Sequence, residues 1–160
     1  MSRTQGTTLL FWGSVAAALV LALMPLPAAL EPLRPFWLAL VVIYWALEEP
    51  ERMTLGRAFL LGLVVDLLGM NLLGESALRL AVLDFILLRF RARMRFFPMP
   101  QQALAIGGLL LNDRVISAGV RLALGEPQLP WSYWWAPLLG MLLWAPLHFV
   151  LDALRLRRRG

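Results

Sequence analysis

The stretch TLLFWGSVAAALVLALM, residues 8–24, decides the class of fold, because it holds no charged side chain. A helix needs about 20 predominantly apolar residues to cross a hydrocarbon layer of roughly 30 Å. This stretch approaches that length before Pro25 and Pro27 end it, so we expect a membrane-spanning helix. A cleaved signal peptide is the alternative, but the preceding basic region is only Arg3 and the rest of the chain is also apolar.

The composition of the whole chain supports the same expectation. The 160 residues are 60% hydrophobic and only 16% charged, and the mean hydropathy is +0.71. A soluble domain typically holds about 45–50% apolar and roughly 25% charged residues. A chain this apolar cannot stay solvated without structure, which excludes disorder. The sequence contains no cysteine, which excludes disulfides and thiolate metal sites.

Five further apolar segments follow the first. The segments at residues 36–47 and 77–90 are short for a bilayer. Either flanking residues with snorkelling side chains lengthen them, or the segment at residues 36–47 is only a half-span. We predict six crossings, with five as the alternative. The chain is then an all-α polytopic membrane protein, a six-helix transmembrane bundle forming a single integral membrane domain over residues 1–160. The predicted spans cover about residues 8–24, 36–47, 55–73, 77–90, 103–124 and 133–154.

The distribution of arginine predicts the orientation. All fifteen basic residues are arginine, and with six crossings eleven of them lie on the side that holds both termini. Because cytoplasmic loops carry the excess of basic residues, both termini are expected in the cytoplasm. The net charge of +5 does not predict nucleic-acid binding, since the arginines flank apolar spans and are placed to meet membrane lipids. An aromatic belt is expected at the opposite interface, formed by Trp131, Tyr133, Trp134 and Trp135.

Four ionisable residues fall near the middle of predicted spans, namely Asp66, Asp84, Asp113 and Arg114. Each is costly in hydrocarbon unless it faces a partner or water. Asp113 and Arg114 lie about 100° apart on a helix and cannot easily pair with each other, so Arg114 is expected to pair with Asp66 or Asp84. Gly62 shares a helical face with Asp66, which would let a neighbouring backbone come close. We expect one interhelical cluster that holds the bundle together, with a proton, ion or ligand path as the alternative.

Motifs of catalytic sites do not occur in the sequence. It holds no nucleophile elbow, no His-Glu-x-x-His and no glycine-rich phosphate loop. The single histidine, His148, stands four residues before Asp152 and is expected to meet it near the membrane boundary. We therefore expect neither an enzyme nor a metal site, and no cofactor.

Three local patterns follow one another in a characteristic order. They are Arg34-Pro35-Phe36-Trp37 leading into Tyr44-Trp45, then Gly56 through Gly62 followed by Asp66-Leu67 and Leu73-Gly74, and finally Gln101-Gln102-Ala103-Leu104 at the start of the fifth span. Together with the chain length and the span layout, they resemble the MreD family of rod shape-determining proteins, in the version typical of Gram-negative bacteria. The resemblance covers nearly the whole chain.

This resemblance implies a non-catalytic protein of the bacterial inner membrane that belongs to the machinery elongating the lateral peptidoglycan wall. It implies association with MreC, a scaffold that activates RodA and its partner transpeptidase, and an indirect connection to MreB filaments. It also implies a fold similar to the substrate-binding subunits of energy-coupling-factor transporters. Capture of a vitamin-type small molecule for a transporter is therefore the alternative function, and ion conduction through the three mid-span aspartates is a third.

The residues expected to matter to the fold or to partner contact come from two sources. The family patterns contribute Arg34, Trp37, Gly62, Asp66 and Gly74. The mid-membrane positions add Asp84, Asp113 and Arg114.

Overall fold

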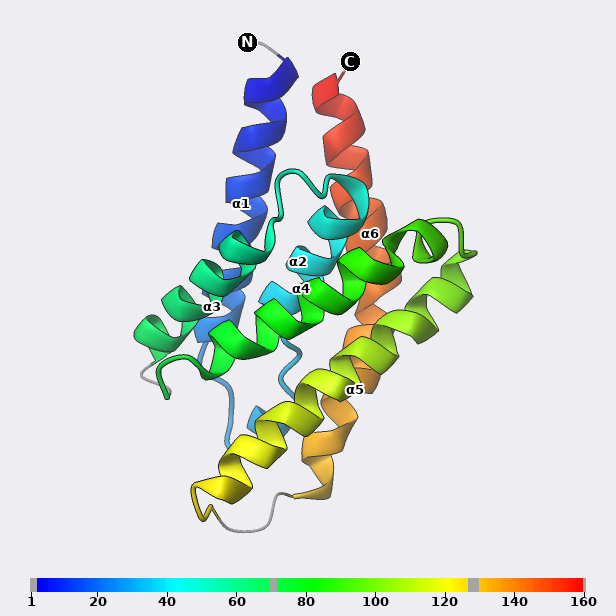
Figure 1. Ribbon diagram of the computed structural model, residues 1–160. Coiled ribbons are helices and arrows are strands. Elements are labelled where there is room, and N and C mark those ends of the chain that lie inside the picture. The colour runs from blue at the N-terminus through cyan, green and yellow to red at the C-terminus, as the bar shows by residue number, and fades with distance from the viewer. Residues whose placement is uncertain (1–2, 70–71, 127–129, 160) are drawn as a thin grey trace.

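The structure is a computed structural model that describes residues 3–69, 72–126 and 130–159, with the backbone alone for residues 3, 32, 158 and 159. Within these residues every regular element is a helix, and α1 and α6 lie side by side with the two termini at the same end of the bundle (Figure 1). The α-helices are α1 (Arg3–Leu23), α2 (Trp37–Glu48), α3 (Leu55–Gly69), α4 (Glu75–Met94), α5 (Met99–Ala123) and α6 (Ala136–Arg159), and two short 3-10 helices are η1 (Glu31–Leu33) and η2 (Trp131–Trp135).

Helix α2 forms the centre of the bundle. Its residues 38–47 are all buried, and α1, α4 and α6 pack around it. Its sequence, WLALVVIYWALE, is apolar on every side, which is typical of a helix enclosed by protein. With 12 residues it is about 18 Å long, less than a hydrocarbon layer of roughly 30 Å. The shortness noted in the sequence therefore belongs to a core helix surrounded by other helices.

Three helical segments of the described chain are long and apolar enough to cross a membrane. They are Thr4–Leu23, Met99–Ala123 and Trp131–Arg157, the last of which joins η2 to α6. Helices α2 and α3 are shorter, and α4 carries ionisable residues along its length. The structure thus confirms an all-α membrane protein with six helices in its described residues, whereas six crossings stay a prediction. The predicted third span includes residues 70 and 71, which lie outside the described residues.

Helix α4 is longer than its apolar segment predicts. It continues to Met94 through arginines that we expected in the following loop. Basic side chains suit this position because the C-terminal end of a helix carries partial negative charge. The Nε of Arg91 also donates to the carbonyl oxygens of Ala46, at 3.1 Å, and Leu47, at 2.9 Å. Arg91 therefore satisfies carbonyl groups at the end of the buried α2, which that helix cannot satisfy itself.

Candidate functional site

The predicted residue Gly62 lies where α3 and α4 meet, and this pair of helices makes the most extensive contact in the bundle. A Cβ atom at Gly62 would lie 2.4 Å from the Cα of Ala77 on α4. That distance is too short for any side chain, so only glycine allows the two backbones to approach this closely. The close approach expected at this position is present, and it fixes α3 against the start of α4.

Asp66 binds the N-terminal end of α4. Its Oδ2 accepts a hydrogen bond from the backbone N–H of Gly74 at 2.9 Å, and both carboxylate oxygens accept from the N–H of Ser76 at 3.2 Å. The first N–H groups of a helix have no partner within it, and negative charge is favourable there. Gly74 has a φ of +97°, in the left-handed region that favours glycine. Gly62, Asp66 and Gly74 therefore build one structural unit, the α3–α4 hairpin.

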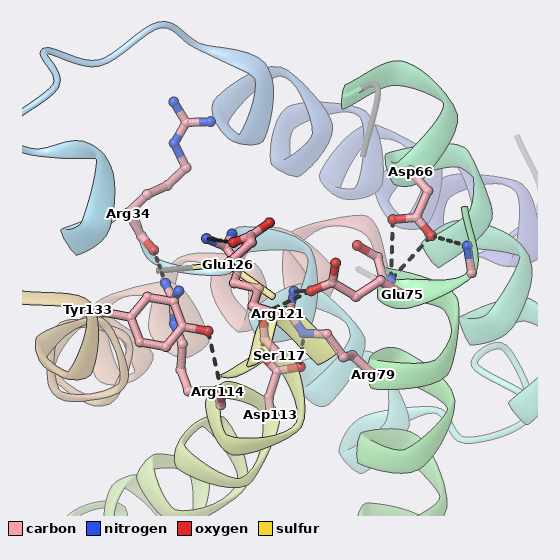
Figure 2. Close-up of polar contacts among 12 residues, drawn as sticks. Arg34, Asp66, Glu75, Arg79, Asp113, Arg114, Ser117, Arg121, Glu126 and Tyr133 are labelled. Atoms are coloured by element: carbon pink, nitrogen blue, oxygen red, sulfur yellow. Dashed lines mark hydrogen bonds and ion pairs between the residues drawn. The ribbon is translucent and has the colours of Figure 1, made fainter. Parts of the chain in front are cut away.

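Asp113 of α5 pairs with Arg79 of α4. The Nε of Arg79 donates to the Oδ1 of Asp113 at 2.9 Å, and its Nη2 donates to Oδ2 at 2.5 Å. The two side chains thus form a bidentate salt bridge (Figure 2). Glu75 lies 3.6 Å from the Nη1 of Arg79 and accepts a hydrogen bond from the hydroxyl of Ser117 at 2.9 Å. This pairing is not expected from the sequence, in which Arg79 lies at the outer end of the predicted fourth span, on the side away from the termini. The four-residue spacings Glu75–Arg79 and Asp113–Ser117 are the signal that would have indicated two polar helix faces.

The prediction that Arg114 pairs with Asp66 or Asp84 is wrong. Its Nη2 donates to the carbonyl oxygen of Arg34 at 2.9 Å, and its guanidinium lies 4.4 Å from the centre of the Tyr133 ring (Figure 2). Helix α4 packs against both α3 and α5. It therefore lies between Asp66 and Arg114. The backbone N–H groups of Gly74 and Ser76 at its N-terminal end already donate hydrogen bonds to the Asp66 carboxylate.

Asp84 is separate from all of these contacts. It is 0% exposed, and neither of its carboxyl oxygens has a hydrogen-bond partner among the described residues. A buried polar group without a partner is a cost to the folded state. The single interhelical cluster that we expected is therefore wrong, since Asp66 binds a helix terminus, Asp113 binds Arg79 and Asp84 is isolated.

Arg34 binds the backbone at the C-terminal end of α1. Its guanidinium donates to the carbonyl oxygens of Ala22 and of Met24, the latter at 2.6 Å, and lies 3.0 Å from the Glu31 carboxylate. The last carbonyl groups of a helix lack partners within it, so this arginine satisfies them and complements the helix dipole. Trp37 begins α2 and packs, partly buried, against the core.

A cavity of about 540 Å³ is lined by residues at the ends of α1 and α3, at the start of α4 and on α5. The end of α1 lies away from the two termini (Figure 1). The walls of the cavity include four arginines, Arg34, Arg79, Arg114 and Arg121, together with Tyr133. Tyr133 is 3% exposed and faces inward, so its predicted place in an aromatic belt is wrong. In η2, which holds Tyr133, the aromatic residues Trp131 and Trp135 point outward, with 88% and 58% exposure.

A second polar group lies near the termini. Arg155 bridges Glu48, at 2.9 Å, and Asp152, at 2.8 Å, and the Tyr44 hydroxyl donates to Asp152 at 3.3 Å. The expected contact between His148 and Asp152 is wrong, because the imidazole packs on the Tyr44 ring and its Nδ1 has no partner among the described residues. The described chain holds no cluster of three or more side chains suited to a metal ion.

Six helices, three of them long and apolar enough for a bilayer, together with ion pairs buried between helices, define an integral membrane protein. The chain matches the family model described as rod shape-determining protein MreD over residues 2–154. It is 30% identical over 138 residues to the rod shape-determining protein MreD of Haemophilus influenzae, covering 86% of this chain and 85% of that relative. The chain therefore belongs to the MreD family, whose role lies in determining rod shape. No solved structure matches it.

Proposed function

We propose that this chain is a non-catalytic scaffold of the wall-elongation machinery in the bacterial inner membrane. In this role it partners MreC, supports lateral peptidoglycan synthesis, and reaches MreB, RodA and the transpeptidase of RodA through that complex. The observation that carries the proposal is the family match, which extends over residues 2–154.

The use of the polar side chains supports a role in helix packing. Asp66 and the Arg79–Asp113 pair are engaged in contacts between helices of this chain. The outward faces of α5 and α6 are apolar, with Leu104 at 67% and Leu142 at 68% exposure. In lipid, such faces associate with other helices through close packing and hydrogen bonds, because hydrocarbon supplies no hydrophobic driving force. A small bundle of this kind can offer helix faces to the membrane segment of MreC.

The proposed topology is one domain over residues 1–160 that crosses the membrane six times with both termini in the cytoplasm. The two termini lie at the same end of the bundle (Figure 1), as an even number of crossings requires. Six crossings put Arg34, Arg79 and Arg121 on the side away from the termini, and all three line the cavity at the opposite end. A fold similar to the substrate-binding subunits of energy-coupling-factor transporters is part of this proposal.

Co-purification tests the partner. The chain is tagged at its C-terminus, extracted from native membranes in mild detergent, and compared with an unrelated inner-membrane protein carrying the same tag. MreC should be recovered with this chain and not with the control. Recovery of folded chain without MreC, in several mild detergents, would contradict the proposal.

The cavity is the observation that favours the alternative function, capture of a vitamin-type molecule for a transporter. Its volume falls within the roughly 300–1,000 Å³ of typical small-molecule sites. Mass spectrometry of the purified protein separates the two functions. A water-soluble organic molecule bound one-to-one would favour the alternative, and a cavity free of such a molecule would favour the scaffold.

A further inference from the structure

Arg114 and Arg121 project from the same face of α5 into the cavity. They are seven residues apart, which places them two helical turns, about 10 Å, from each other along one side of the helix. Both guanidinium groups lie against the same aromatic ring, at 4.4 Å and 5.7 Å from the centre of Tyr133. Two cations held near one ring repel each other, unless an anion between them offsets that repulsion.

Within the described part of the chain, Arg114 and Arg121 lack strong anionic partners of their own. Arg34 pairs with Glu31, and Arg79 is engaged by Asp113. Among the carboxylates that the structure describes, Arg121 meets only Glu126, at 3.7 Å, and both side chains of that pair are more than 40% exposed. Exposed pairs of this type contribute little.

Arg114 forms no salt bridge with a carboxylate among the described residues, where its guanidinium donates to the Arg34 carbonyl and shares a side-chain hydrogen bond with Tyr133. A guanidinium carries five N–H donors in a planar fork. Most of the donors of Arg114 are therefore free for a ligand that enters the cavity.

Part of the cavity wall is apolar and continues onto the outer surface. Leu23, at the end of α1, and Leu68, on α3, both line the cavity and are 45% and 51% exposed. In a membrane these exposed faces meet lipid chains. The cavity therefore joins a cationic interior to an exposed apolar surface at the end of the bundle.

We propose that this cavity binds a phosphate group through Arg114 and Arg121. Guanidinium groups bind phosphate oxygens in a bidentate geometry. A membrane phospholipid and a soluble phosphate carry the same group, and the apolar wall at Leu23 and Leu68 favours the lipid. This inference is independent of the proposed partnership with MreC.

The test measures lipid binding to the delipidated protein in detergent by native mass spectrometry. Dioleoyl phosphatidic acid is compared with dioleoylglycerol, which differs only in lacking the phosphate, and inorganic phosphate is added as a competitor. The double variant R114Q/R121Q is compared with R93Q/R157Q, which removes the same charge from two exposed positions outside the cavity. Arg121→Gln alone serves if the double variant fails to fold, because the Arg121 side chain is 43% exposed and packs little.

Phosphatidic acid should bind the wild-type protein and R93Q/R157Q equally. It should bind about tenfold more weakly for each arginine removed from the cavity, since charge-assisted hydrogen bonds contribute on that scale. Displacement of phosphatidic acid by inorganic phosphate, with the same dependence on Arg114 and Arg121, would support the phosphate site. It would identify soluble phosphate, rather than a lipid headgroup, as the ligand. Equal binding of dioleoylglycerol, or phosphatidic acid binding unchanged in both cavity variants, would overturn the proposal.

Discussion

At the residue scale, Asp66, Asp84 and Asp113 are all buried within helices, and each has a different environment. An aspartate within an apolar run is costly unless it meets a partner, and this reasoning singled out the three positions, although Asp84 has no hydrogen-bond partner among the described residues. Which group satisfies each one depends on where helices cross, and no spacing along one helix contains that information. Asp66 thus binds backbone N–H groups of α4, which have no side-chain signature, and Arg114 binds a carbonyl and an aromatic ring.

Gly62→Ala should destabilise the fold by about 1–3 kcal/mol, the usual cost of overpacking. Its Cβ would lie 2.4 Å from backbone atoms of α4, which cannot rotate away as a side chain can. Thermal unfolding in detergent measures the change. Gly56→Ala is the matched control on the same helix, because nothing lies within 4 Å of a Cβ there. Equal midpoints for the two variants would contradict the close approach of α3 and α4.

Asp84→Leu should raise the stability of the isolated protein by about 1–3 kcal/mol. Neither oxygen of the carboxyl group has a partner among the described residues, so its removal relieves a cost without breaking a contact. Unfolding in detergent, with Asp113→Leu as a variant that breaks a pair, provides the measurement. A loss of stability in Asp84→Leu equal to that in Asp113→Leu would show that Asp84 has a partner in the folded chain.

At the element scale, apolar length predicts the helices well and their ends poorly. Each predicted segment overlaps one observed helix, because a continuous apolar run has no other way to satisfy its backbone in lipid. The predicted segment ends before α4 does, because the last turns of the helix are rich in arginine. An apolar pattern marks the part of a helix that suits hydrocarbon, and the helix itself can continue beyond it. Because α2 is apolar on every side, its sequence indicates that other helices surround it.

The contact between α4 and α5 depends on the Arg79–Asp113 pair, and a double-mutant cycle measures this dependence. Arg79→Leu should cost about 3–5 kcal/mol, because it leaves a buried carboxylate without its cation. The double variant R79L/D113L should lose less than the two single variants combined, since it leaves neither charge of the pair unmatched. Additive losses would mean that the two side chains are not energetically coupled.

At the scale of the whole molecule, the absence of cysteine makes the topology directly measurable. Ala28→Cys and Glu51→Cys place single thiols at two exposed positions, one in each of the first two connections between α-helices. A membrane-impermeant maleimide applied to spheroplasts should label Ala28→Cys immediately and Glu51→Cys only after the inner membrane is opened. The reverse order would contradict cytoplasmic termini, and labelling of both without opening would contradict a crossing between them.

Cell shape is the most direct test of the central claim, which is that this membrane bundle acts in lateral wall elongation. The chain is depleted in the bacterium that encodes it, and cell outline and MreC localisation are recorded together. The account predicts that cells lose their rod shape and round up, that MreC loses its normal localisation, and that restored expression reverses both. Cells that remain rods with MreC in its normal position after complete depletion would contradict it.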